Sequence, residues 1–151
     1  MNFSIIYGGT IEVFKNEDIF LKANVNNRIK THLNFFKGNK SILESTLFSF
    51  FTWRKVKLTY QDLPHPIDRI FQMGVLKFGL TFNNHFIICS QKPFQKTMCL
   101  LYLDDTEIAS IQSTTKPTTG YSRYTMISQS DDDEINLYLL LCFLLPYTPT
   151  W

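Results

Sequence analysis

The sequence lacks the short motifs that mark common enzyme classes. It contains no Gly-rich phosphate-binding loop, no GxSxG elbow and no HExxH metal-binding pair. His32, His65 and His85 have no metal-ligand spacing to one another or to a cysteine. We therefore expect no catalytic residues, no metal site and no cofactor, and we predict that the protein is not an enzyme.

Cysteine is also scarce. Cys89, Cys99 and Cys142 are the only three in the chain, so they cannot all pair, and Cys142 lies in the most apolar segment. Buried, reduced thiols are the simplest interpretation. The first residues lack the cationic stretch of a secretory signal, which favours a cytoplasmic protein, with peripheral association with a membrane left open.

No linker, low-complexity tract or internal repeat divides the 151 residues, so a single domain over residues 1–151 is predicted. An aromatic content of 15%, with 14 Phe and 7 Tyr, favours β-structure. Turn residues recur at short intervals, at 8–9, 15–18, 26–27, 38–39, 83–84 and 104–105. Short apolar runs between such turns are typical of an antiparallel meander.

Two segments alternate cleanly between apolar and polar residues. The apolar sides consist of Ile19, Leu21, Ala23 and Val25 in the first and Ile29, Thr31, Leu33 and Phe35 in the second. A three-residue loop over 26–28 sets Val25 opposite Ile29 and keeps these sides together, so we predict that register. Further strands are predicted at 10–14, 42–51, 54–60, 77–82, 85–90, 96–103, 107–112 and 121–128.

Two other segments are expected to differ from strands. Residues 66–73 begin with Pro66, carry Ile67, Ile70 and Phe71 at helical spacing and end before Gly74, which predicts a short helix. Residues 113–120 are polar and contain Pro and Gly, which predicts a surface loop.

The strongest pattern is the apolar run INLYLLLCFLL at residues 135–145. Acidic residues at 131–134 precede it and Pro146 follows it, which predicts a helix over about residues 132–145 with the acids as caps. Apart from Asn136 the run has no polar residue, so the helix has no side to present to water. Eleven residues cover only about 16 Å at about 1.5 Å each, too little to cross a hydrocarbon core of about 30 Å. The helix must therefore be buried within protein.

A strand meander with such a helix favours a mostly β fold, in which the meander closes into a barrel around the hydrophobic C-terminal helix. A two-layer α+β sandwich, with the helix covered by another element or a second subunit, is the alternative. The layout of strands through Ser128, an acidic lead-in and a hydrophobic helix resembles the tubby-like superfamily, which includes LURP-one-related and scramblase-type proteins. The resemblance covers nearly the whole chain but includes no diagnostic motif, so it identifies no binding residues. It implies a twelve-stranded barrel that binds phosphoinositides or other membrane lipids.

Charge is unevenly distributed, although the net charge is only +2. Residues 22–60 carry eight Lys or Arg against the single acid Glu44, whereas residues 101–151 carry seven acids against Lys116 and Arg123. This asymmetry predicts a basic and an acidic side. The candidate ligand-binding residues, expected to form one patch on the basic side, are Lys22, Lys30, His32, Arg54, Lys55 and Lys57.

Such a patch can serve as a solvated surface or can bind phosphate groups. Our first hypothesis is a non-enzymatic module that binds anionic lipid headgroups at a membrane surface. The second is a protein-interaction domain, such as an inhibitor or immunity protein that docks its partner by electrostatic complementarity. The third is an enzyme with an unrecognised pocket. The low net charge argues against nucleic acid as the partner.

Overall fold

The structure is a computed structural model that describes residues 1–27, 30–50, 53–93, 95–114 and 122–146. It contains a series of β-strands followed by one helix. Their bounds are β1 (Asn2–Tyr7), β2 (Thr10–Lys15), β3 (Asp18–Asn27), β4 (Thr31–Lys37), β5 (Lys40–Phe50), β6 (Trp53–Gln61), β7 (Ile67–Gln72), β8 (Lys77–Phe82), β9 (His85–Gln91), β10 (Thr97–Leu103), β11 (Thr106–Ser113), β12 (Ser122–Ser128) and α1 (Asp133–Leu144).

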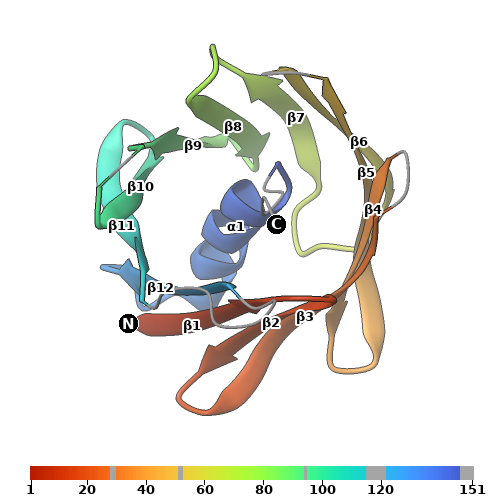
Figure 1. Cartoon of the computed structure of the whole chain (residues 1–151), viewed down its shortest axis with the longest axis horizontal. Helices are drawn as coiled ribbons and strands as arrows, with labels where there is room; N and C mark the ends of the chain where they lie inside the picture. Colours follow the sequence, from red (N-terminus) through yellow and green to blue (C-terminus); the bar gives the residue numbers. More distant parts are fainter. Residues whose placement is uncertain (28–29, 51–52, 94, 115–121, 147–151) are drawn as a thin grey trace.

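The strands form one 12-stranded antiparallel sheet in the order β6-β5-β4-β3-β2-β1-β12-β11-β10-β9-β8-β7. Each strand pairs with its neighbour in sequence, except that β6 and β7 lie at the two ends of the sheet and β1 pairs with β12. The sheet curls into a nearly closed barrel, and α1 lies inside it (Figure 1). The predicted barrel around a C-terminal helix is confirmed, and the alternative sandwich is not formed.

Tight turns connect most of the strands where the sequence predicts them. Three two-residue turns have left-handed backbone at both positions, namely Asn16-Glu17, Asn83-Asn84 and Asp104-Asp105. Asn and Asp tolerate that conformation better than other non-glycine residues, because their short side chains can hydrogen-bond locally. The composition of these turns therefore identifies the hairpins correctly.

The predicted register between β3 and β4 is wrong. Asn26 and Asn27 belong to β3 instead of to a loop, and Val25 lies opposite Leu33 and not opposite Ile29. The error moves the pairing by an even number of residues, which leaves the same side chains on each side of the sheet. Alternation alone could not distinguish the two registers, because both keep the apolar sides together.

A β-bulge changes the alternation near the start of β3. Val13 of β2 pairs with Leu21, but the next residue, Phe14, pairs with Ile19, so Phe20 is an extra residue in β3. The bulge reverses the orientation of the residues before it. Phe20 is therefore 8% exposed and Ile19 is 57% exposed. The prediction that Ile19 lies on the apolar side is wrong, whereas Leu21 does lie there.

Residues 67–72 form strand β7 instead of the predicted helix. So short a helix would be marginal by itself, whereas β8 offers a partner along the whole segment, for example Leu80 opposite Ile70. Gly74 has a φ of 73° and lies in the turn to β8, so it does not end a helix. Strand β1 was not predicted either. The predicted loop over 113–120 falls mostly outside the described residues.

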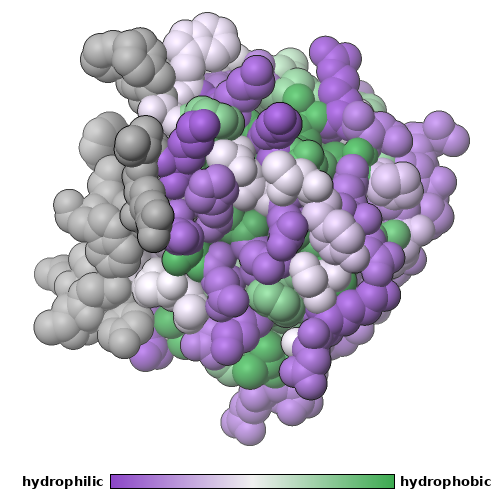
Figure 2. Space-filling model, turned by 90° about the vertical axis from the view of Figure 1, so that its right-hand side faces the viewer, coloured by the Kyte–Doolittle hydropathy of each residue, from purple (hydrophilic) through white to green (hydrophobic). Residues whose placement is uncertain are grey.

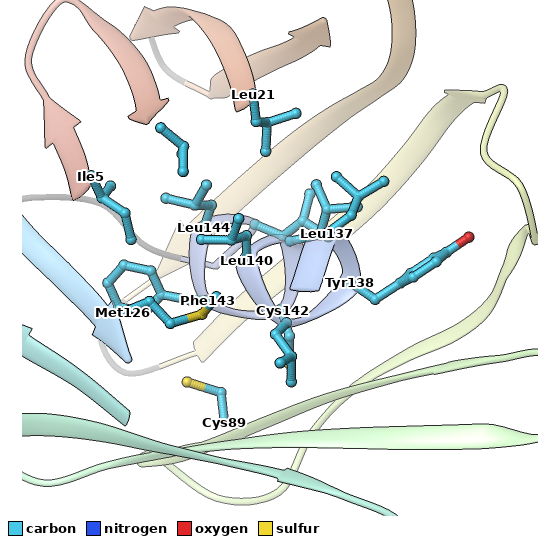
Figure 3. Close-up of a cluster of buried hydrophobic side chains, with 14 of the residues drawn as sticks. Ile5, Leu21, Cys89, Met126, Leu137, Tyr138, Leu140, Cys142, Phe143 and Leu144 are labelled. Atoms are coloured by element: carbon cyan, nitrogen blue, oxygen red, sulfur yellow. The ribbon is translucent and has the colours of Figure 1, made fainter. Parts of the chain in front are cut away.

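The helix fills the barrel. Asp132 is its N-cap and accepts a hydrogen bond from the backbone N–H of Glu134, as the acidic lead-in predicts. Every residue from 136 to 144 is buried. Leu140 and Leu144 lie on the side of Ile5 and Leu21 (Figure 3).

Other sides of α1 contact other strands. Tyr138 stacks on Phe82 of β8 with 3.8 Å between ring centroids, and Phe143 meets Tyr124 of β12 edge-on at 5.8 Å. Cys142 points towards β9 (Figure 3), where its Sγ lies 3.9 Å from the carbonyl oxygen of Ile87. The predicted burial on all sides is thus confirmed. Within the described part of the chain, there is no helix of the length and apolarity that crossing a bilayer requires.

Candidate functional site

The two ends of the barrel differ in charge. In an up-and-down meander, every second connection lies at the same end. The connections after β1, β3, β5, β7, β9 and β11 lie at the end where α1 terminates, and we call this the basic end. The connections after β2, β4, β6, β8, β10 and β12 lie at the end where α1 begins, and we call this the acidic end.

The basic end carries only cationic charge among the described residues. Its connections, with the two strand residues on either side of each, contain Lys30, Arg54, Lys77, Lys92, Lys96 and Arg123, and neither Asp nor Glu. Lys55 lies one residue further along β6. The potential over this end is therefore positive, and it attracts anions.

The acidic end has the opposite composition. By the same definition, together with the first two residues of α1, its acids are Glu17, Asp18, Asp62, Asp68, Asp104, Asp105, Glu107, Asp131, Asp132, Asp133 and Glu134. Its lysines are Lys15, Lys37 and Lys40. Two of these are already neutralised, because the Nζ of Lys15 lies 2.7 Å from Asp133 Oδ1 and that of Lys40 lies 2.9 Å from Asp62 Oδ2.

The direction of α1 agrees with this distribution. The positive end of the helix dipole lies at the acidic end and its negative end at the basic end. At the negative end of the dipole the contact is direct. Arg54 Nη1 donates a hydrogen bond to the carbonyl oxygen of Pro146 at 3.1 Å, just beyond the helix. The helix and the connections therefore stabilise each other electrostatically.

Four of the predicted site residues lie together on the outer surface of β4, β5 and β6. The Nζ of Lys30 lies 4.6 Å from the ring centroid of Phe48, and Lys55 is the cross-strand partner of Phe48. In the next row His32 and Lys57 are both cross-strand partners of Thr46, and His32 Nδ1 lies 3.0 Å from the Thr46 hydroxyl. Figure 2 shows this side of the barrel, where hydrophilic side chains surround small apolar patches.

The other two predicted residues lie elsewhere. Lys22 is exposed on β3, where its partners are Glu12 and Phe36, away from Lys30. Arg54 points into the barrel, towards Pro146. Successive residues of a strand face opposite sides, so Arg54 cannot share the outer surface with Lys55. The expectation of one patch from all six residues is therefore wrong for these two.

Exposed apolar side chains gather at the basic end, and the sequence analysis missed them. Trp53 is 70% exposed at the start of β6, and Met73, Val75 and Leu76 are 53%, 57% and 42% exposed in the turn after β7. The two hairpins meet, because the backbone N–H of Arg54 donates to Gln72 Oε1 at 2.9 Å. The sequence signal was available, since turns are normally polar and residues 73–76 read Met-Gly-Val-Leu.

The chemistry available elsewhere is limited. A cavity of about 490 Å³ lies at the acidic end and is lined by Lys37, Asp62, Leu63, Glu134 and Leu137 among others. The three cysteines are free and buried, as predicted. Among the residues that the structure describes, no group of His, Cys, Asp and Glu side chains could hold a metal ion.

The fold and these surfaces define the class of the protein as a nearly closed antiparallel β-barrel filled by one helix, with one basic and one acidic end. Comparison with protein-family models, with curated proteins and with solved structures found no match for the chain.

Proposed function

We propose that the protein is a non-enzymatic binding module that docks on an anionic membrane surface with its basic end. The observation that carries the proposal is the coincidence of two features at that end. Cations without a described carboxylate lie at the same end of the barrel as the exposed apolar side chains of Trp53, Met73, Val75 and Leu76. Trp is enriched where proteins meet the headgroup region of a membrane, and apolar tips beside Lys residues are typical of proteins that lie on its surface.

The charge distribution would also orient the protein. Each Lys or Arg close to an anionic bilayer contributes about 1 kcal/mol of attraction. The acidic end is repelled by the same surface, so the barrel axis would stand away from the membrane with α1 pointing towards it. A barrel with mixed charge at both ends would have no such preference.

The resemblance to the tubby-like superfamily supports this proposal. The resemblance implies twelve strands around a central helix, and the chain has that strand number and that helix. It also implies ligands that are phosphoinositides or other membrane lipids. The proposal assigns such headgroups to the basic end, near Lys30, Lys55 and Lys77.

Vesicle flotation tests the proposal. The protein should float with phosphatidylcholine vesicles that contain phosphatidylserine or a phosphoinositide, and should not float with phosphatidylcholine alone. Replacing Lys30, Lys55 and Lys77 with Glu should weaken binding by on the order of a hundredfold or more, from about 1 kcal/mol per cation. The matched control replaces Lys22, Lys57 and Arg69 with Glu. It makes the same change in net charge, but on the side of the barrel.

The control variant should retain most of the binding. Equal losses in the two variants would mean that only net charge matters, and the basic end would not be the docking site. A protein that does not bind either kind of anionic vesicle would refute the membrane proposal and leave protein docking as the better account.

A further inference from the structure

The barrel has a seam between β6 and β7, the two ends of the sheet (Figure 1). Glutamine side chains bridge it. Gln61 Oε1 accepts the backbone N–H of Ile67 at 2.8 Å, and its Nε2 donates to the carbonyl oxygen of the same residue at 3.1 Å. Near the other end, Gln72 Oε1 accepts the backbone N–H of Arg54. In a paired sheet, backbone groups of neighbouring strands hydrogen-bond directly. Here a glutamine side chain lies between the backbones of β6 and β7, so these two strands are further apart than paired strands.

Backbone groups of both strands face this seam. In an antiparallel strand, alternate residues direct their N–H and C=O groups to opposite edges. The backbone N–H of Arg54 faces β7, so the N–H groups of Val56 and Leu58 face β7 as well. The backbone N–H groups of Lys55 and Lys57 face β5. On β7, the N–H of Met73 bonds to β8, so Ile70 faces the seam. Both edges therefore present donors and acceptors in strand geometry.

The space between the strands is a groove of about 320 Å³. Residues of both strands line it, namely Val56, Lys57, Leu58, Gln61, Ile67, Asp68, Arg69 and Ile70. The apolar members are buried or half-buried, and Val56, Leu58 and Ile70 pack against the core of the barrel. The solvent-exposed charged residues of the groove are the cations Lys57 and Arg69 and the carboxylate Asp68, so the groove has an excess of positive charge.

We propose that this seam binds an extended segment of a partner protein as an additional strand. Strand addition to an exposed edge derives its affinity from backbone hydrogen bonds and its specificity from alternate side chains. Apolar residues of the guest would face Val56 and Leu58, and acidic residues would lie between Lys57 and Arg69. The recognised sequence therefore alternates apolar and acidic residues.

A guest strand would displace the glutamine bridges. Some Cα atoms of β6 and β7 lie within 8 Å of each other, so the seam must widen to the roughly 9.5 Å that a strand between them requires. Natural sheets usually protect their edges, because an open edge invites pairing with other chains. Here the side-chain amides of Gln61 and Gln72 occupy the places of peptide groups, so the peptide groups of a guest strand can replace them with the same donors and acceptors. The glutamines satisfy Ile67 and Arg54 in the free protein, whereas the N–H groups of Val56, Leu58 and Ile70 remain available to a guest.

Amide hydrogen exchange followed by NMR tests the proposal on the unmodified protein. In the free protein, the amides of Val56 and Leu58 should exchange fast, while those of Lys55 and Lys57 on the same strand should be protected by β5. A capped peptide in which Val and Glu alternate should protect Val56, Leu58 and Ile70. Slow exchange of Val56 and Leu58 in the free protein, or no protection by the peptide, would overturn the proposal.

Charge reversal tests the specificity. A peptide with Lys in place of Glu should bind on the order of tenfold more weakly, and replacement of Lys57 and Arg69 with Glu should reverse that preference. A variant of the basic end, with Lys30 and Lys77 replaced by Glu, is the matched control and should bind the peptide like the unmodified protein. Equal binding of both peptides would contradict the assigned role of the two cations. None of these outcomes depends on membrane binding.

Discussion

Asn136 is the one polar side chain in the buried part of α1, and its contacts explain why it is tolerated there. Its Oδ1 accepts from the Ser128 hydroxyl at 2.6 Å, and its Nδ2 donates to the carbonyl oxygen of Ser130 at 3.0 Å. These bonds tie the start of the helix to the end of β12. A buried amide is costly only when its partners are missing.

Replacing Asn136 with Ala should therefore lower the free energy of unfolding by about 1–3 kcal/mol, because Ser128 and Ser130 lose a buried partner. Urea denaturation measures the change. Asn24, which is exposed on β3, is the matched control, and its replacement with Ala should alter stability by about 0.5 kcal/mol or less. Equal effects at the two positions would show that the contacts of Asn136 contribute nothing.

Cys142 should make stability depend on alkaline pH. Burial raises the pKa of its thiol, and a hydrogen bond to Cys99 together with burial raises the pKa of Cys89. In the unfolded chain, thiols ionise near pH 8.5. Above that pH the unfolded state loses protons that the folded state keeps, so the free energy of unfolding falls as pH rises, and below that pH it is unaffected.

Replacing Cys142 with Ala should reduce that slope between pH 9 and pH 10 by about 1.4 kcal/mol per pH unit. The slope is the right quantity, because the cavity left by the substitution lowers stability equally at every pH. Tyr7, whose pKa burial raises to about 12, adds its own dependence only above about pH 10. Urea denaturation at several pH values gives the slopes, and identical slopes would rule out the buried thiol as their source.

At the scale of elements, the sequence predicts what local chemistry determines. The strands from β8 to β12 and the helix were placed to within about two residues, because turn residues and one uniformly apolar run define them. The bulge at Phe20, the register at Val25 and the strand at 67–72 depend on partners distant in the sequence. Alternation or helical spacing within one segment contains no information about such partners.

The candidate site was predictable only in part, for the same reason. Lys30, His32, Lys55 and Lys57 come together because their strands are neighbours in the meander. The sequence did not show whether the side chain of Arg54 faces inwards or outwards. The run before it is apolar at successive positions, so no alternation indicates which residues of the strand face the core. The sequence predicted a basic and an acidic side from the charges of separate blocks of the chain, whereas the charges separate between the two ends of the barrel. That arrangement appears only when alternate connections are assigned to the same end.

At the scale of the whole molecule, segregated charge should matter more than net charge. Near the pH at which the net charge is zero, the protein should bind both cation- and anion-exchange resins at low ionic strength, where charges are little screened. The variant with Glu at positions 30, 55 and 77 should lose retention on the cation exchanger. The variant with Glu at 22, 57 and 69 should keep part of it, and the same loss in both would argue against a polar charge distribution.

The pairing of β1 with β12 and the enclosure of α1 have a consequence for the order of folding. Ile5 lies opposite Tyr124, and the side chains that fill the interior come from residues 136–144. A growing chain that ends before residue 122 has neither the partner of its first strand nor the filling of its core. Contacts between residues so far apart in the sequence form slowly, so we expect the barrel to assemble late and around α1. Until α1 has been synthesised, the apolar residues that line the barrel have no helix to pack against. Synthesis of α1 therefore allows the barrel to close.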